Sequence, residues 1–246
     1  MNYERARWLK RVGAILGMMA LGCGAVFAQT EAGAKTVEFR GIQIDKVKRT
    51  VTFPAAINMT EGMLEYLIVS EMGKTHESLL STKINPYDIQ VAMLLLGVKP
   101  AGKAAVEPPA QITAQYLQSA PELKGETVNI YVSWKDARQM SHRARAEEMV
   151  WSLKTNAVMT QGKWIYNGSE MYGGKFLAQV DGSVVALVRD SAALVNNPRP
   201  GNDDDQIWQA NGKAEPKAGT AVDITIELAE NPPLDRNSAP ADSPGK

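Results

Sequence analysis

The chain has 246 residues with 27 Lys and Arg, 27 Asp and Glu, two His and a single Cys, and 44 % of its residues are hydrophobic. These values are ordinary for a globular protein and exclude a collagen-like, a disulfide-rich and a wholly disordered chain. Because the formal net charge is zero, we expect no nucleic-acid partner. A single cysteine cannot hold an iron–sulfur cluster, so we expect no such cofactor.

The first 28 residues are predicted to be a signal peptide. A basic stretch opens it with Arg5, Arg7, Lys10 and Arg11. The uncharged run 12–24 that follows is short for a membrane span, and residues 26–28 offer small side chains for cleavage before Gln29. An uncleaved anchor is the alternative. We therefore expect an exported protein, periplasmic or secreted.

A second processing route is open at Cys23. The segment Ala20-Leu21-Gly22-Cys23 resembles a bacterial lipobox with its first two residues interchanged. Lipid on Cys23 would tether the chain to a membrane. Association with a membrane is expected only through this lipid or through the leader. Cleavage after Ala28 would leave 218 residues without cysteine, with 23 positive and 26 negative side chains.

The remaining chain divides by composition into three parts. Residues 29–38 are small and polar, as in a flexible lead-in, and residues 230–246 form a Pro-rich tail predicted to be disordered. Residues 39–229 are expected to form a single domain. Within it, residues 99–124 suggest a long linking loop with a short helix near 112–118.

The most definite element is a helix over residues 86–96. Asn85 is a favourable N-cap, Pro86 suits the first helical position, and Gly97 suits the C-terminal stop. The helix has almost no polar face, so we expect it to be buried on nearly all sides. It would then form the spine of the fold.

Most other segments are predicted to be strands, and Asp181-Gly182 is the strongest two-residue hairpin signal. Expected strands are 42–45, 50–53, 64–69, 128–134, 164–166, 176–180, 184–188 and 221–228. Short helices are expected at 146–151 and 191–195. The predicted fold class is therefore α+β, a mainly antiparallel β-sheet packed around one buried helix (86–96) plus short helices.

The conspicuous polar segment is 73–78. Its candidate binding residues are Lys74, Thr75, His76, Glu77 and Ser78. It resembles the end of a phosphate-binding loop, but Ile68 stands where that loop needs a glycine. On a strand, His76 and Ser78 would share one face and could act as base and nucleophile. Alternatively, they belong to a buried polar network.

No cofactor is predicted, although a divalent metal held by carboxylates stays open. The weak metal candidates are Asp203, Asp204 and Asp205, for which a solvated acidic loop is the alternative. Arg138, His142, Arg143 and Arg145 precede Glu147 and Glu148, which suggests local ion pairing. Four aromatic residues could line a sugar or peptide groove or belong to the core: Trp134, Trp151, Trp164 and Trp208.

The string Gly73-Lys74-Thr75-His76-Glu77-Ser78, the helix ending at Gly97 and the later segments 146–151, 164–169 and 181–183 resemble the YdjY-type domain of exported bacterial proteins. The resemblance spans residues 39–228. It implies export but no established activity and no assigned catalytic residues. Some members of that family are labelled ferredoxin-like, and a body without cysteine cannot supply cluster ligands.

These observations lead to two hypotheses about function. The first is an exported, non-catalytic binding or interaction module whose partner is an envelope protein or a small ligand. The alternative is a hydrolase or metal-assisted enzyme that uses the segment Gly73–Ser78.

Overall fold

The computed structural model describes residues 36–99, 123–214 and 216–229. The predicted signal peptide, most of the lead-in, the predicted helix near 112–118 and the predicted tail lie outside the described residues. The first strand, β1, begins at Thr36. Within the described ranges, no helix is both long and apolar enough to cross a membrane.

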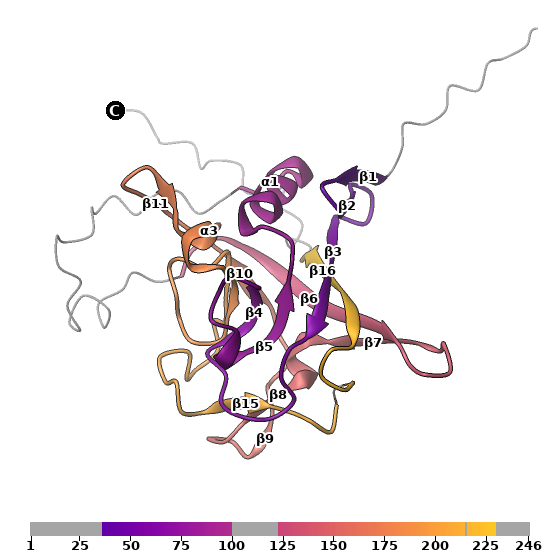
Figure 1. Cartoon of the computed structure of the whole chain (residues 1–246). Helices are drawn as coiled ribbons and strands as arrows, with labels where there is room; N and C mark the ends of the chain where they lie inside the picture. Colours follow the sequence, from indigo (N-terminus) through magenta and orange to yellow (C-terminus); the bar gives the residue numbers. More distant parts are fainter. Residues whose placement is uncertain (1–35, 100–122, 215, 230–246) are drawn as a thin grey trace, which may run out of the picture. The chain divides into compact units, whose positions relative to one another are not determined.

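Eight strands form a closed β-barrel (Figure 1). In their order around the barrel they are β3 (Thr50–Ile57), β16 (Ala221–Leu228), β6 (Glu126–Lys135), β10 (Trp164–Tyr166), β14 (Val195–Asn196), β13 (Ser183–Ala186), β4 (Tyr66–Ser70) and β5 (Ser78–Thr82). The ring closes because β5 pairs with β3 through Ala56↔Ser81 and Ile57↔Leu80. Most pairs are antiparallel, and the exceptions are β4–β5 and β13–β14.

Further elements surround this barrel. The sheet is extended by β1 (Thr36–Phe39) and β2 (Ile42–Asp45) beside β3, and by β7 (Ser141–Arg145) beside β6. A second sheet contains β15 (Trp208–Ala210), β8 (Val150–Ser152) and β9 (Ala157–Val158), and a hairpin contains β11 (Met171–Tyr172) and β12 (Lys175–Phe176). The helical elements are α1 (Pro86–Leu96), α3 (Leu177–Asp181), η1 (Thr75–Glu77) and η2 (Ala146–Met149).

The strand sequences explain why the sheet closes. Alternate residues of β6 and β16 point into the barrel and are buried: Val128, Ile130, Val132, Val222, Ile224 and Ile226. Trp164 and Tyr166 of β10 add the two largest fully buried side chains. Burying each large apolar side chain stabilises the fold by about 1.5–3 kcal/mol. The barrel therefore encloses its own core.

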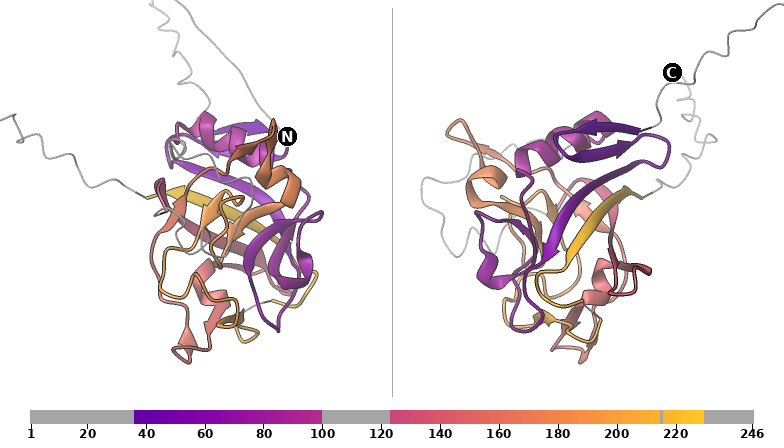
Figure 2. Two further views of the ribbon diagram at one scale, coloured as in Figure 1. Left: turned by 90° about the vertical axis from the view of Figure 1, so that its left-hand side faces the viewer. Right: turned by 45° about the vertical axis from the view of Figure 1, so that its right-hand side comes forward.

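The predicted fold class is wrong, because the structure is mostly β, with two short helices and 14 % helix among the described residues. The helix α1 has the predicted bounds and ends at Gly97 in the left-handed region. It lies over one end of the barrel (Figure 2), however. Tyr87 and Leu95 are 54 % and 49 % exposed. A sheet that closes on itself covers its own apolar face, so no central helix is needed.

Two local predictions are wrong. Asp181-Gly182 does not join two strands, because Leu177–Asp181 forms α3 and Gly182, at φ 72°, caps that helix. Residues 191–195 turn into β14 rather than forming a helix. By contrast, the strands predicted at 42–45, 128–134 and 221–228 are confirmed.

Candidate functional site

The segment 73–78 forms a turn followed by a strand. Thr75–Glu77 is one turn of 3₁₀ helix, and β5 begins only at Ser78. The side-chain amide of Asn58 donates to the carbonyl oxygens of Thr75 and Ser78, both at 2.6 Å. These bonds hold the turn against the end of β3.

His76 and Ser78 point to different surroundings. The Ser78 side chain is buried, and its hydroxyl donates to the Lys74 carbonyl oxygen at 2.6 Å. The His76 ring is 78 % exposed, and its Nε2 lies 3.7 Å from Glu77 Oε2. The structure thus pairs His76 with Glu77 and uses the Ser78 hydroxyl to close the turn.

Lys74 is the centre of a charged cluster on β4 and η1. Its Nζ lies 2.9 Å from Glu77 Oε1 and 3.2 Å from Glu65 Oε2, and 5.3 Å from the centroid of the Tyr66 ring. Burial lowers the pKa of Lys74, but the bonds to the two carboxylates outweigh burial and raise that pKa above its usual range. The two carboxylates therefore favour the protonated, charged form of Lys74.

Tyr66 also keeps its proton. Its hydroxyl donates to Asp190 Oδ2 at 3.1 Å. Burial, and then the nearby Asp190 carboxylate, raise the pKa of Tyr66. The same two causes raise the pKa of Asp181. The cluster consequently contains ion-paired and hydrogen-bonded groups rather than an activated nucleophile.

Gly73 is required by packing. A Cβ on Gly73 would lie 3.1 Å from the carbonyl oxygens of both Asp181 and Gly182. The Ser70 N–H donates to the Gly182 carbonyl at 2.7 Å, which fixes this close approach. The glycine of the Gly-Lys-Thr string therefore lets two backbone segments touch, and it does not form part of a phosphate-binding loop.

The metal candidates lie on an exposed turn. Asp204 Oδ1 accepts the Gln206 N–H at 2.9 Å, and Asp205 Oδ1 accepts from the Gln206 side-chain amide at the same distance. In the part of the chain that the structure describes, no three His, Cys, Asp or Glu side chains group as they would around a metal ion. Asp203 takes part in neither of these two hydrogen bonds.

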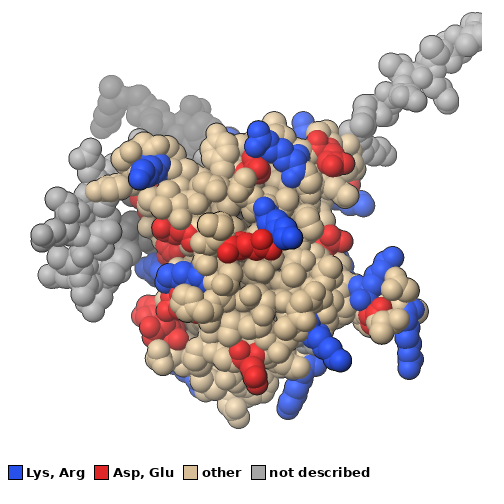
Figure 3. All heavy atoms as spheres, in the orientation of Figure 1, with Lys and Arg blue, Asp and Glu red and all other residues tan. Residues whose placement is uncertain are grey.

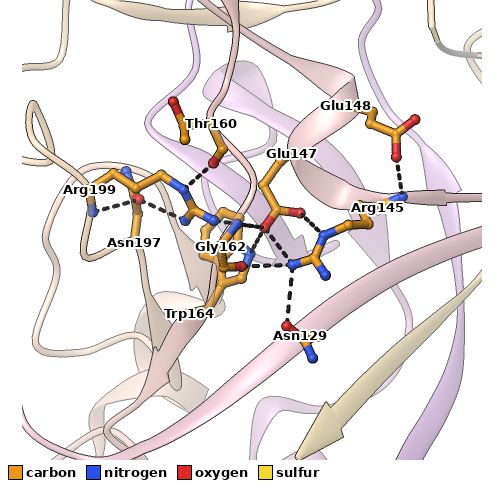
Figure 4. Close-up of polar contacts among 9 residues, drawn as sticks. All are labelled: Asn129, Arg145, Glu147, Glu148, Thr160, Gly162, Trp164, Asn197 and Arg199. Carbon is orange, nitrogen blue, oxygen red and sulfur yellow. Dashed lines mark hydrogen bonds and ion pairs between the residues drawn. The ribbon is translucent and has the colours of Figure 1, made fainter. Parts of the chain in front are cut away.

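The most extensive polar network surrounds Glu147 of η2, which is fully buried (Figure 4). Arg145 Nη2 lies 2.9 Å and Arg199 Nη2 2.7 Å from Glu147 Oε1. The same oxygen accepts the Trp164 indole N–H at 3.2 Å and the Gly162 backbone N–H at 3.1 Å. One carboxylate thus holds together η2, β10 and the loop that carries Arg199.

The two arginines of this network also bond to backbone carbonyls. Arg145 Nη2 donates to the Gly162 carbonyl at 2.7 Å, and Arg199 Nε donates to the Thr160 carbonyl at 2.6 Å. The Arg199 guanidinium stacks 4.8 Å from the Trp164 ring. Hydrogen bonds to Glu147 raise the pKa of Arg145, whereas burial lowers that of Arg199. Because its charges are used internally, the network serves the fold rather than a ligand.

The four tryptophans fall into two pairs. Trp164 and Trp208 are buried, and their indole N–H groups donate to Glu147 and to the Gly201 carbonyl. Trp134 and Trp151 are half-buried and line two surface grooves. The sequence does not distinguish these pairs, because only the fold decides which tryptophans face the barrel.

The first groove has a volume of about 390 Å³ and lies beside Trp151 of β8. Its walls are the loop 60–62 and the loop 209–213. Its polar side chains include Glu61, Gln209 and Asn211. In size it falls within the range of about 300–1,000 Å³ that is typical of small-molecule sites.

The second groove has a volume of about 470 Å³ and lies at the root of the β6–β7 hairpin. Trp134 stacks on His142 with ring centroids 5.4 Å apart. His142 Nε2 lies 3.0 Å from Asp136 Oδ2, and this bond lowers the pKa of Asp136. In this groove, therefore, Asp136 and His142 are engaged with each other.

Charged residues do not gather by sign on the face in view in Figure 3, where Lys and Arg are interspersed with Asp and Glu. A family model described as YdjY domain matches residues 42–227. No curated protein and no solved structure matches the chain. The matched span contains both grooves, the Lys74 cluster and the Glu147 network.

Proposed function

The chain belongs to the YdjY domain family, and from that premise we propose that it is an exported protein of the periplasm or cell envelope that binds a ligand or partner without catalysis. The basic, uncharged and small-residue segments of residues 1–28 support export. The family description itself names no activity.

The observation that carries the binding function is the contrast between engaged and unengaged groups. The groups of the segment 73–78 are engaged, because Lys74 is ion-paired and the Ser78 hydroxyl donates to a backbone carbonyl. Trp151, in contrast, is half-buried at an open groove, where Glu61 and Lys213 are exposed. A preformed concave surface with an aromatic side chain is a feature of binding sites.

Export is tested by expressing the full chain in a bacterial host with two membranes and sequencing the N-terminus of the product. Cleavage before Gln29 in the periplasmic fraction is the expected result. Lipid on Cys23 that is absent from Cys23→Ala would instead show that the chain is exported as a lipoprotein. An uncleaved chain in the cytoplasm would contradict export.

The absence of catalysis is tested with p-nitrophenyl acetate and p-nitrophenyl phosphate, with and without added zinc. We expect no turnover by the purified protein, and no difference between the wild type, His76→Ala and Ser78→Ala. Turnover that disappears in either variant would contradict a non-catalytic module and support the hydrolase hypothesis. Metal analysis of the same samples reports any stoichiometric ion that depends on His76.

A further inference from the structure

We propose that the groove beside Trp151 binds a sugar residue of an uncharged oligosaccharide, with one pyranose ring stacked on the indole. This inference rests on the proposed binding function and adds the class of ligand. It is carried by three features of the groove, namely a row of side chains centred on Trp151, a rigid pair of walls and a set of unengaged polar groups without net charge.

The sheet β15–β8–β9 lies at the end of the barrel opposite α1 (Figure 1), and the row lies on the outer face of this sheet. Trp151 is paired with Gln209 on one side and with Val158 on the other. Directly paired residues of antiparallel strands share a face. Since Val150 and Ser152 are buried, the indole points outward, and it lies in the middle of a row of three side chains.

The row continues beyond β15, because Gln209 forms an antiparallel bridge with Met63. The two loops at this edge are joined by backbone contacts. The Ala210 N–H donates to the Gly62 carbonyl at 3.1 Å, and a Cβ on Gly212 would lie only 2.6 Å from the Thr60 carbonyl oxygen. The walls of the groove therefore touch each other through backbone atoms, which preorganises the site.

Asn211 fixes the floor of the groove. Its backbone N–H donates to the Met149 carbonyl at 2.9 Å, and its side-chain amide donates to the Glu148 carbonyl at 2.8 Å. The side-chain oxygen of Asn211 is left as an acceptor. Because Met149 and Glu148 belong to η2, the groove is tied to the element that carries the buried Glu147.

Three polar side chains at the groove form no hydrogen bond or ion pair with other described residues, namely Glu61, Gln209 and Lys213. Asn211 differs, because its side-chain amide donates to the Glu148 carbonyl. Among the described residues, the Trp151 indole N–H likewise has no protein acceptor, whereas those of Trp164 and Trp208 have one. Unpaired hydrogen-bond donors and acceptors thus both surround the apolar face of the Trp151 indole.

This combination matches a sugar better than an ionic or a purely apolar ligand. A pyranose has an apolar face of C–H groups and a rim of hydroxyls that both donate and accept, as the indole and the amides require. One carboxylate and one ammonium leave the groove without net charge, so a polyanionic ligand would gain little. The volume of about 390 Å³ accommodates a small oligosaccharide rather than a folded partner.

The experiment measures binding of the mature protein to cellotriose, maltotriose and tri-N-acetylchitotriose by isothermal titration at millimolar sugar. We expect at least one of the three to bind. Trp151→Ala should weaken that binding by about tenfold or more, and Gln209→Ala by a smaller factor. The matched control is Trp134→Ala in the second groove, which should leave the affinity unchanged.

Three outcomes would overturn the inference. They are no binding of any of the three sugars, equal binding by the wild type and a folded Trp151→Ala variant, and loss of binding in Trp134→Ala instead. Thermal melting of each variant establishes that it is folded. Gln209→Ala, which removes no aromatic surface, provides the second readout if Trp151→Ala does not fold.

The test also separates this inference from the proposed function. Reducing ends are assayed after each titration, and sugar that is bound and hydrolysed would contradict the non-catalytic proposal while leaving the ligand class intact. Failure to bind sugar would remove the ligand class only. The fractionation and turnover experiments would then still decide export and catalysis.

Discussion

Glu147 and Trp151 lie four residues apart in the chain, yet their surroundings use polar groups in opposite ways. Around Glu147, two arginines, an indole N–H and a backbone N–H all converge on one buried carboxylate. Around Trp151, the side chains of Glu61, Gln209 and Lys213 form no hydrogen bond or ion pair with the described residues.

The comparison separates polar groups that stabilise the fold from polar groups that can meet a ligand. A buried carboxylate is tolerated only when it is paired, and two arginines and two N–H donors pair with that of Glu147. Groups at an open groove are hydrogen-bonded to water, so they need no protein partner, and a ligand can replace that water. Four predictions test this division, from the largest expected effect to the smallest.

Glu147→Ala is expected to destabilise the protein by about 3–5 kcal/mol, because it leaves two largely buried guanidinium groups without a counter-charge. Urea unfolding at neutral pH measures the change. The control is Glu148→Ala. Among the described residues, the Glu148 side chain accepts only the Arg145 backbone N–H, at 3.1 Å, so this variant should lose about 1 kcal/mol. Equal losses in the two variants would contradict a special role of the buried carboxylate.

The same substitution at two tryptophans should separate core from groove. Trp164→Phe removes the indole donor to Glu147 and part of a fully buried ring, so we expect a loss of about 2–3 kcal/mol. Trp151→Phe should change the free energy of unfolding by less than about 0.5 kcal/mol. Denaturant midpoints compare the two. A large loss at Trp151 would mean that this indole is a packing residue.

Replacing a glycine by alanine should destabilise the protein more at the wall of the Trp151 groove than at the edge of the Glu147 network. Gly212→Ala places a Cβ 2.6 Å from a backbone oxygen, which must move, and we expect a loss of about 1–2 kcal/mol. Gly162→Ala meets only the end of the Arg199 side chain at 3.3 Å and should cost less. The order of the two melting temperatures is the measurement, and a reversed order would contradict the rigid wall.

The smallest expected effect concerns Asp136 in the second groove. The bond from His142, and then the Met140 N–H, lower the pKa of Asp136 in the folded protein. Its stabilising contribution is therefore present above the unfolded pKa of about 3.9 and is lost as the pH falls through the folded value.

Asp136→Asn should accordingly lower the melting temperature slightly at pH 6 and not at pH 2. Asp203→Asn, at an exposed carboxylate, is the control and should change neither value. A difference that persists at low pH would show that Asp136 acts through its shape rather than its charge.

Local sequence predicted several elements well. Pro86 and Gly97 fixed the bounds of α1, and the alternation in β6 and β16 identified two central strands. The relation between these elements was not predictable in this way. Closure depends on the pairing of β3 with β5. Nothing in the sequence of either strand predicts that it pairs with the other. The expected central helix therefore became a cover over the end of a barrel.

The candidate site shows the same limit. The Arg145–Glu147 pair is visible from spacing, but Arg199 is 52 residues further along the chain and reaches Glu147 only through the fold. The four tryptophans were recognised as core or groove residues without a means to sort them. Trp151 could be assigned to the groove once Val150 and Ser152 on either side were seen to be buried.

The sequence by itself determined the family, the bounds of the strongest helix and the alternating strands, because these depend on neighbouring residues and on local backbone preferences. Tertiary structure alone decided that the sheet closes, which carboxylate is buried and paired, and which tryptophans face solvent. Those features depend on contacts between distant segments. Local propensity carries no information about which distant strands will pair or which polar groups their pairing will enclose.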